Sequence, residues 1–324
     1  MRETNRKQQG EGRTGRSRPQ TSQLLESRSW MSRMVLLLVA PWTAAQCVLQ
    51  FHAWEQTEPS VAWITLGMCA LLGGLVWRLR AGTPGAAAMG AAITACLIWG
   101  TIQFPYTDWL RSALTPLLVT LALTLSATRL GRRWRKKRNS HTEIDFEEAH
   151  RGRDAAQVAA NLGGAAISVT LVPFAPAVVA HNPNFAALIA YAVLAEAAAD
   201  TVSSELGQAF GGTPRMITNW RRVAAGTDGA VTLEGTLAGL AAAGMVALAG
   251  IWTLTGAVRG QWLGLALILV GGVAGWVFDS LLGAVVERRG WLNNDAVNFA
   301  STVCAGAVTL ELARGLAALM LWQG

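Results

Sequence analysis

Several acidic residues of this 324-residue chain fall inside or at the edges of long apolar segments. Ionisable groups in such segments are rare, and they usually mark functional sites. Glu196, Asp200 and Glu205 lie near the end of one segment, and Asp279 lies near the end of another. A third segment begins with three further polar residues, Asn294, Asp295 and Asn298.

Carboxylates and amides without His or Cys suit a hard cation such as Mg²⁺, which typically takes one or two carboxylates and substrate phosphates. We therefore predict that Asp200, Asp279 and Asp295 hold Mg²⁺. The stretch Gly226-Thr227-Asp228-Gly229 precedes another apolar segment, and backbone N–H groups at a helix start bind phosphate. Nearby arginines are candidates for clamping phosphate oxygens: Arg221, Arg222, Arg288 and Arg289. This combination predicts phosphoryl or nucleotidyl transfer.

The composition indicates what must position these residues. The chain is 52% apolar and 15% charged, whereas soluble domains carry roughly 25% charged residues. A secreted disulfide scaffold, a disordered chain and a soluble nucleic-acid binder are excluded. The four cysteines are scattered singly, which is typical of apolar packing and not of a disulfide framework or zinc site.

We expect an all-α, multi-pass membrane protein, because a membrane span needs about 20 mostly apolar residues. Residues 1–30 are polar and Arg-rich and are expected to form a disordered cytoplasmic tail, with an organellar transit peptide as the alternative. The predicted spans are 34–51, 60–77, 83–104, 109–129, 157–180, 184–206, 230–256, 262–286 and 296–322.

The distribution of basic residues predicts the orientation. With the N-terminus in the cytoplasm, 24 of the 27 Lys and Arg residues fall on the cytoplasmic side, as the positive-inside rule requires. The polar groups at the ends of the sixth and eighth spans and the start of the ninth then meet at the cytoplasmic face. The linker 129–156 contains the basic run 132–138, for which contact with anionic lipids is favoured over nucleic acid. The excess of Arg over Lys indicates a bacterial plasma membrane.

Several segments also resemble a known family. These are RGRDAAQVAANLGG (151–164), AEAAADTVSSELG (195–207), GTDGAVTLEGTLAG (226–239), VFDSLLGA (277–284) and NNDAVNF (293–299). They resemble the integral-membrane family of unknown function numbered ninety-two, which includes transmembrane protein nineteen and the plant phytyl-phosphate kinase. The resemblance covers residues 81–324, so 31–80 are expected to be extra N-terminal helices. More distantly, the chain resembles polyprenol kinases and CDP-diacylglycerol synthases.

The resemblance implies a kinase that converts an isoprenoid monophosphate to its diphosphate with ATP or CTP. It implies catalytic roles for Asp200, Glu205, Asp279 and Asp295. It also implies that substrate and phosphate are bound by Gln157, Asn161, Ser204, Gly226, Thr227, Gly229, Thr236, Ser280, Arg288, Asn294 and Asn298.

Two other functions stay open. A cytidylyltransferase would use CTP to form a CDP-lipid and release pyrophosphate. A transporter of an anionic or lipidic substrate would also need acidic groups within its spans, although carriers place their sites near the midplane, within repeated halves.

Overall fold

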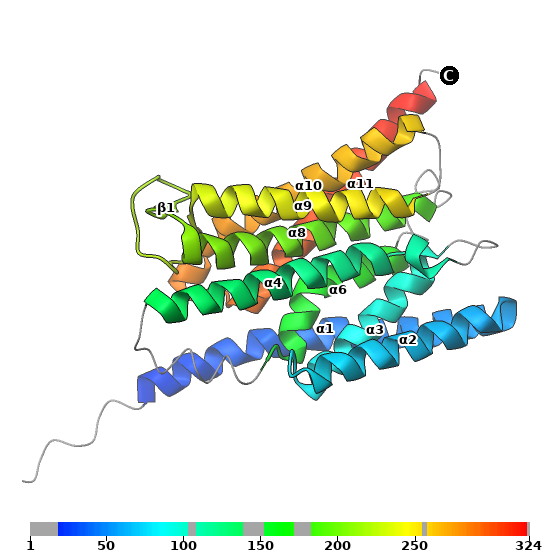
Figure 1. Cartoon of the computed structure of the whole chain (residues 1–324), viewed down its shortest axis with the longest axis horizontal. Helices are drawn as coiled ribbons and strands as arrows, with labels where there is room; N and C mark the ends of the chain where they lie inside the picture. The colour runs from blue at the N-terminus through cyan, green and yellow to red at the C-terminus, as the bar shows by residue number, and fades with distance from the viewer. Residues whose placement is uncertain (1–18, 103–107, 139–151, 172–182, 255–257, 323–324) are drawn as a thin grey trace, which may run out of the picture.

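The computed structural model describes residues 19–102, 108–138, 152–171, 183–254 and 258–322. Long helices dominate these residues and lie side by side along the longest dimension of the molecule (Figure 1). Their bounds are α1 Pro19–Thr57, α2 Pro59–Arg78, α3 Pro84–Thr101, α4 Leu114–Arg138, α6 Ala155–Leu171, α8 Pro183–Phe210, α9 Leu233–Thr253, α10 Val258–Val285 and α11 Asn294–Trp322. The all-α fold class is confirmed.

Eight of these helices are long and apolar enough to cross a membrane. The exception within the described residues is α6, which has 17 residues and corresponds to the predicted span 157–180; residues 172–182 lie outside the described part. Each predicted span overlaps one helix. The predicted tail, residues 1–30, differs because α1 begins at Pro19, and residues 1–18 are outside the described part.

The fourth predicted span, 109–129, differs from the observed helix at both ends. Asp108 accepts a hydrogen bond from the Leu110 backbone N–H (3.0 Å) and starts a short 3₁₀ turn, Trp109–Arg111. The helix α4 begins only at Leu114 and continues to Arg138. Part of the predicted basic linker 129–156 is therefore helical, while residues 139–151 fall outside the described structure.

Proline and threonine define several helix starts. Pro59 and Pro84 occupy first-turn positions, where the missing N–H costs nothing. Thr83 caps α3 and Thr232 caps α9 by accepting from backbone N–H groups of the first turn. The sharp start of α9 matters for the site, because it fixes the loop that precedes this helix.

The helix α8 lies at the centre of the bundle, and 83% of its most apolar stretch is buried inside the protein. It lies among α4, α6, α9, α10 and α11 (Figure 1). Glycines permit close packing: a Cβ on Gly272 would lie 3.0 Å from Ala195 Cβ, and one on Gly275 would lie 2.9 Å from Glu196 Cγ. These contacts bring α10 against the polar face of α8.

A small two-stranded sheet, which the sequence did not predict, lies at one end of the bundle. Strands β1 (Arg215–Met216) and β2 (Ala230–Val231) are antiparallel and pair within the α8–α9 connection. The start of α1 and the end of α4 lie at this same end (Figure 1). We call it the polar end, because it carries the candidate site described next.

Candidate functional site

A cavity of about 250 Å³ opens at the polar end, between the ends of four helices and the loop before β2. Its polar lining comes from α8, α9, α10, α11 and this loop. Ten predicted site residues line it: Asp200, Ser204, Gly226, Thr227, Gly229, Thr236, Asp279, Ser280, Asn294 and Asn298. The sequence analysis thus located residues that are dispersed over about 100 positions and that the fold gathers in one cavity.

Asp200 on α8 and Asp279 on α10 are the two carboxylates that the bundle helices contribute to this cavity, and Asp228 and Glu287 line it from the connecting segments. A hydrogen bond from Trp276 Nε1 to Ser203 Oγ (3.0 Å) joins the same two helices beside them. The Asn298 side-chain nitrogen, in its favoured amide orientation, donates to Asp279 Oδ2 (3.3 Å) and to the Asn294 carbonyl (3.2 Å). Asp279 is therefore supported from α11 while it faces the cavity.

Asn161 on α6 contacts the side chain of Asn298. Its side-chain amide lies 3.3 Å from that of Asn298, and it donates to the Gln157 carbonyl (2.8 Å). Gln157 itself forms a capping box with Asp154 at the start of α6. Both residues therefore stabilise the local structure, and Asn161 reaches the cavity only through Asn298.

Glu196 lies one helical turn deeper than Asp200 and is 2% exposed. One carboxylate oxygen accepts a hydrogen bond from Ser301 Oγ at 2.7 Å. Within the described residues, the other oxygen has no hydrogen-bond partner. This side chain extends the line of polar groups from the cavity toward the interior of the bundle.

The loop 226–229 depends on glycine at two positions. Gly226 and Gly229 have φ values of +82° and +73°, which non-glycine residues adopt only with strain. A Cβ on Gly229 would clash with the backbone of Ala284 on α10. Thr227 closes the turn, because its hydroxyl donates to the Ala224 carbonyl at 2.8 Å. The loop is thereby held over the end of α10, and its backbone lines the cavity.

The N-terminus of α9 faces the same cavity, since Thr232, Gly235 and Thr236 contribute to its lining. A helix N-terminus carries partial positive charge and binds anions such as phosphate. Carboxylates and a helix N-terminus that line one cavity can hold a divalent cation and a phosphate group together.

Asp295 is not among the carboxylates that line this cavity. It lines a neighbouring polar cavity with Gln157, Asp228 and Glu287. Within the described residues, no three His, Cys, Asp or Glu side chains are placed to hold a metal ion. Asp200 and Asp279 nevertheless fit Mg²⁺, which needs one or two carboxylates plus phosphate oxygens. Of the three predicted metal ligands, Asp200 and Asp279 line this cavity and Asp295 lines the neighbouring one, because Asn294 and Asp295 are adjacent on a helix and point about 100° apart.

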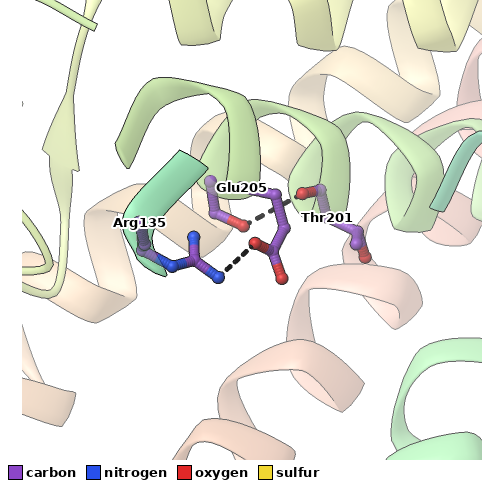
Figure 2. A network of polar contacts seen from close by, with 4 residues as sticks. Arg135, Thr201 and Glu205 are labelled. Atoms are coloured by element: carbon purple, nitrogen blue, oxygen red, sulfur yellow. Dashed lines mark hydrogen bonds and ion pairs between the residues drawn. The ribbon is translucent and has the colours of Figure 1, made fainter. Parts of the chain in front are cut away.

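Glu205 forms an ion pair outside the cavity lining. Arg135 Nη2 reaches from α4 to Glu205 Oε2 at 2.7 Å, close to Thr201, as Figure 2 shows. Gly131 makes room for this pair, because a Cβ there would lie 2.6 Å from the same oxygen. The contact ties the end of α4 to the end of α8. The catalytic role predicted for Glu205 thus has no support from its position.

The Arg135–Glu205 pair predicts a small and specific effect on stability. The partly exposed pair is expected to contribute at most about 1 kcal/mol. A double-mutant cycle with Arg135→Gln and Glu205→Gln, read from thermal unfolding in detergent, should give a coupling free energy between zero and this value. Coupling of several kcal/mol would contradict this interpretation of the pair as a solvent-screened contact.

Arg153, which the sequence analysis did not single out, interacts electrostatically with the carboxylates of Glu205 and Asp200. Burial lowers the pKa of its guanidinium, while the charges of Glu205 and Asp200 act in the opposite direction. Its backbone bonds to the segment before α3, since Thr83 N donates to the Arg153 carbonyl at 2.9 Å. An arginine remains charged in proteins, so this half-buried cation sits beside Asp200 with its backbone anchored.

The four arginines predicted to clamp phosphate are absent from the lining of the cavity. Arg288 lies 3.8 Å from the Met216 sulfur, and Arg289 stacks over the Trp291 ring at 5.2 Å. Arg221 and Arg222 are exposed on the β1–β2 connection. The clamping role predicted for these four arginines therefore has no counterpart in the cavity lining, whereas the charge of Arg153 interacts with that of Asp200.

A bundle of long apolar helices with a carboxylate-containing cavity at one end defines a multi-pass integral membrane protein whose site lies at the end of its spans. The chain belongs to the family described as Integral membrane protein DUF92, whose model matches residues 67–306. The resemblance inferred from the sequence is confirmed. No solved structure matches the chain.

Three relatives illustrate the range of the family. The chain is 42% identical over 139 residues to the uncharacterized membrane protein MJ0933 of Methanocaldococcus jannaschii, covering 43% of this chain and 56% of the relative. It is 28% identical over 208 residues to the uncharacterized membrane protein sll0875 of Synechocystis sp. (60% and 72%). It is 39% identical over 102 residues to the chloroplastic protein VTE6 of Arabidopsis thaliana (31% and 29%). The chain therefore spans only about half the length of the first relative.

Proposed function

We propose that this protein is a lipid-phosphate kinase, which transfers the terminal phosphoryl group of a nucleoside triphosphate to an isoprenoid monophosphate. One observation carries the proposal: Asp200 and Asp279 share a cavity with the Gly226–Gly229 loop and the N-terminus of α9. Such a site can bind Mg²⁺ and phosphate oxygens together. The resemblance to the family of the plant phytyl-phosphate kinase supports the choice of substrate.

The proposed reaction forms one bond and breaks one bond. An oxygen of the lipid monophosphate attacks the terminal phosphorus of ATP or CTP, and the bond from this phosphorus to the bridging oxygen breaks. The products are a lipid diphosphate and a nucleoside diphosphate. Phosphoryl transfer depends mainly on positioning and electrostatic stabilisation, so no protein nucleophile is required.

Each part of the cavity has a role in this scheme. Asp200 and Asp279 would hold Mg²⁺, which neutralises charge on the transferred group when bound. The loop and the α9 N-terminus would bind phosphate oxygens through backbone N–H groups. Asn298 fixes Asp279 by its hydrogen bond, and Arg153 supplies positive charge beside Asp200.

We further propose that the cavity faces the cytoplasm, where nucleoside triphosphates are available. Arg135, Arg153 and Arg288 lie at the polar end, together with the start of α1. Basic residues beside spans favour the cytoplasmic side and contact anionic lipids. The lipid phosphate would then enter from the cytoplasmic leaflet.

Product analysis tests the proposed function. Purified protein in detergent is incubated with Mg²⁺, ATP or CTP, and phytyl, geranylgeranyl or longer prenyl phosphates. We expect a lipid diphosphate and a nucleoside diphosphate, and expect chelation of Mg²⁺ by EDTA to abolish both. A CDP-lipid with pyrophosphate would instead identify a cytidylyltransferase. Flux of lipid phosphate into liposomes with the nucleotide unchanged would identify a transporter.

A further inference from the structure

The first helix, α1, supplies a polar contact to the start of α11 from outside the residues that the family model matches. Ser32 Oγ donates a hydrogen bond to Asp295 Oδ2 on α11 at 2.5 Å. The same hydroxyl oxygen accepts a hydrogen bond from Asn293 Nδ2 at 2.8 Å. The family match begins only at residue 67. A helix expected to be an additional N-terminal element thus contacts the helix that carries Asn294 and Asn298.

Both partners of Ser32 control the first turn of α11. The Asn293 side chain caps this helix by accepting from the Ala296 backbone N–H (2.9 Å), and the Asn293 carbonyl accepts from the Val297 N–H (3.0 Å). Asp295 stands in the first turn and is 8% exposed. One hydroxyl therefore links the cap of α11 to a buried carboxylate in its first turn.

The position of Ser32 is determined by the packing of α1. Val39, about two turns further along, is fully buried and packs at Gly163 of α6, where a Cβ would lie 2.7 Å from Val39 Cγ1. Trp42 Nε1 donates to Thr170 Oγ1 at 2.8 Å on the same helix. Since α6 packs in turn on α11, the three helices hold the hydroxyl at the start of α11.

We infer that Ser32 is a positioning residue for the cavity, acting through Asn293 and Asp295 on the orientation of the first turns of α11. Asn294 and Asn298 line the cavity from these turns, and Asn298 donates to Asp279. Removing the hydroxyl leaves the buried Asp295 oxygen without this donor. An unsatisfied buried group is costly, so the first turn rearranges and carries both asparagines with it. The inference rests on the proposed kinase function.

The test compares Ser32→Ala, Ser32→Thr and Ser32→Val in the full-length protein. Thr retains the hydroxyl and Val has the same shape without it, so any steric effect of the extra methyl group is shared. We expect Ala and Val to lower kcat/KM about 10- to 100-fold, as loss of an outer-shell partner typically does. Thr should restore most of the activity. Ser60→Ala, which removes an exposed hydroxyl bonded to Glu58 at the start of α2, serves as the matched control.

Two further measurements separate positioning from a role in stability alone. The effects of Ser32→Ala and Asp295→Asn on kcat/KM should be strongly non-additive, since both act on the same turn. The Kd for a non-hydrolysable ATP analogue with Mg²⁺, read from thermal shifts, should rise for Ala and Val but not for Thr. This binding measurement does not depend on turnover.

The outcomes are distinguishable. Wild-type kcat/KM and Kd in the Ala and Val variants would overturn the positioning role while the proposed function stands. A lower melting temperature with unchanged kcat/KM would show that Ser32 acts on stability alone and would likewise overturn it. A wild-type protein that neither transfers phosphate nor binds the nucleotide analogue would contradict the proposed function itself, together with the inference built on it.

Discussion

Asp279→Asn is expected to lower kcat for phosphoryl transfer by about 10²- to 10³-fold or more, and Asp200→Asn should have an effect of similar size. Both changes keep the shape of the side chain and remove the negative charge that would hold Mg²⁺. The two aspartates lie on separate helices, α8 and α10, within one cavity. Turnover is measured over a range of Mg²⁺ concentrations, because a weakened metal site should raise the Mg²⁺ concentration needed for half-maximal rate.

Glu311→Gln provides the control for this prediction. Glu311 is exposed on α11 and pairs with Arg314 at 2.8 Å, so its replacement removes a carboxylate that does not line the cavity. We expect wild-type kinetics in this variant and an unchanged elution profile in all three. Full activity of both Asp200→Asn and Asp279→Asn would refute the assignment of the carboxylate pair.

Gly229→Ala is expected to have the second large effect, because it combines backbone strain with a steric clash. The positive φ at this position costs a non-glycine residue about 1–2 kcal/mol. The added Cβ also meets the backbone of Ala284, and overpacking of this kind costs about 1–3 kcal/mol. The loop should therefore move away from α10, and both transfer activity and the melting temperature should fall.

Gly226→Ala is the matched control for the loop. Gly226 has a similar positive φ, but no atom lies within 4 Å of a Cβ placed there. This variant therefore experiences the strain without the clash. We expect it to melt clearly above Gly229→Ala and to retain more activity. Equal behaviour of the two variants would show that contact between the loop and α10 is unimportant.

The positions of the long helices within the described residues could be predicted because a membrane-spanning helix needs about 20 mostly apolar residues, a property of the local sequence. The exact ends of the helices were harder to predict from the sequence. The start of α4 shifts to Leu114 because Asp108 and Ser112 bond to nearby backbone groups and favour a 3₁₀ turn first. The β1–β2 pairing depends on the conformation of a connection with positive φ at Gly226 and Gly229, which apolar patterning does not reveal.

Many residues of the candidate site could be predicted from the sequence, but the contacts between them could not. Polar and glycine residues at matching depths of different spans identified ten residues of the cavity lining. Glu205 lies outside the cavity lining. Its contact with Arg135 could not be predicted, because Arg135 lies 70 residues away on α4. Ser32 was missed because its contact to Asp295 spans 263 residues and a serine near a polar tail has no distinguishing local signal. Long-range pairing of this kind is determined by packing.

The central position of α8 has a consequence for biogenesis. Glu196 and Asp200 lie within this helix, and insertion of a carboxylate near the centre of a span costs about 2.5–3.5 kcal/mol. In the finished bundle Glu196 is buried, and Asp200 is half-buried and lines the cavity. During synthesis, however, α8 emerges before α9, α10 and α11, which later cover it. We therefore expect the insertion of α8 to be less favourable before α9, α10 and α11 are present than after they pack against it.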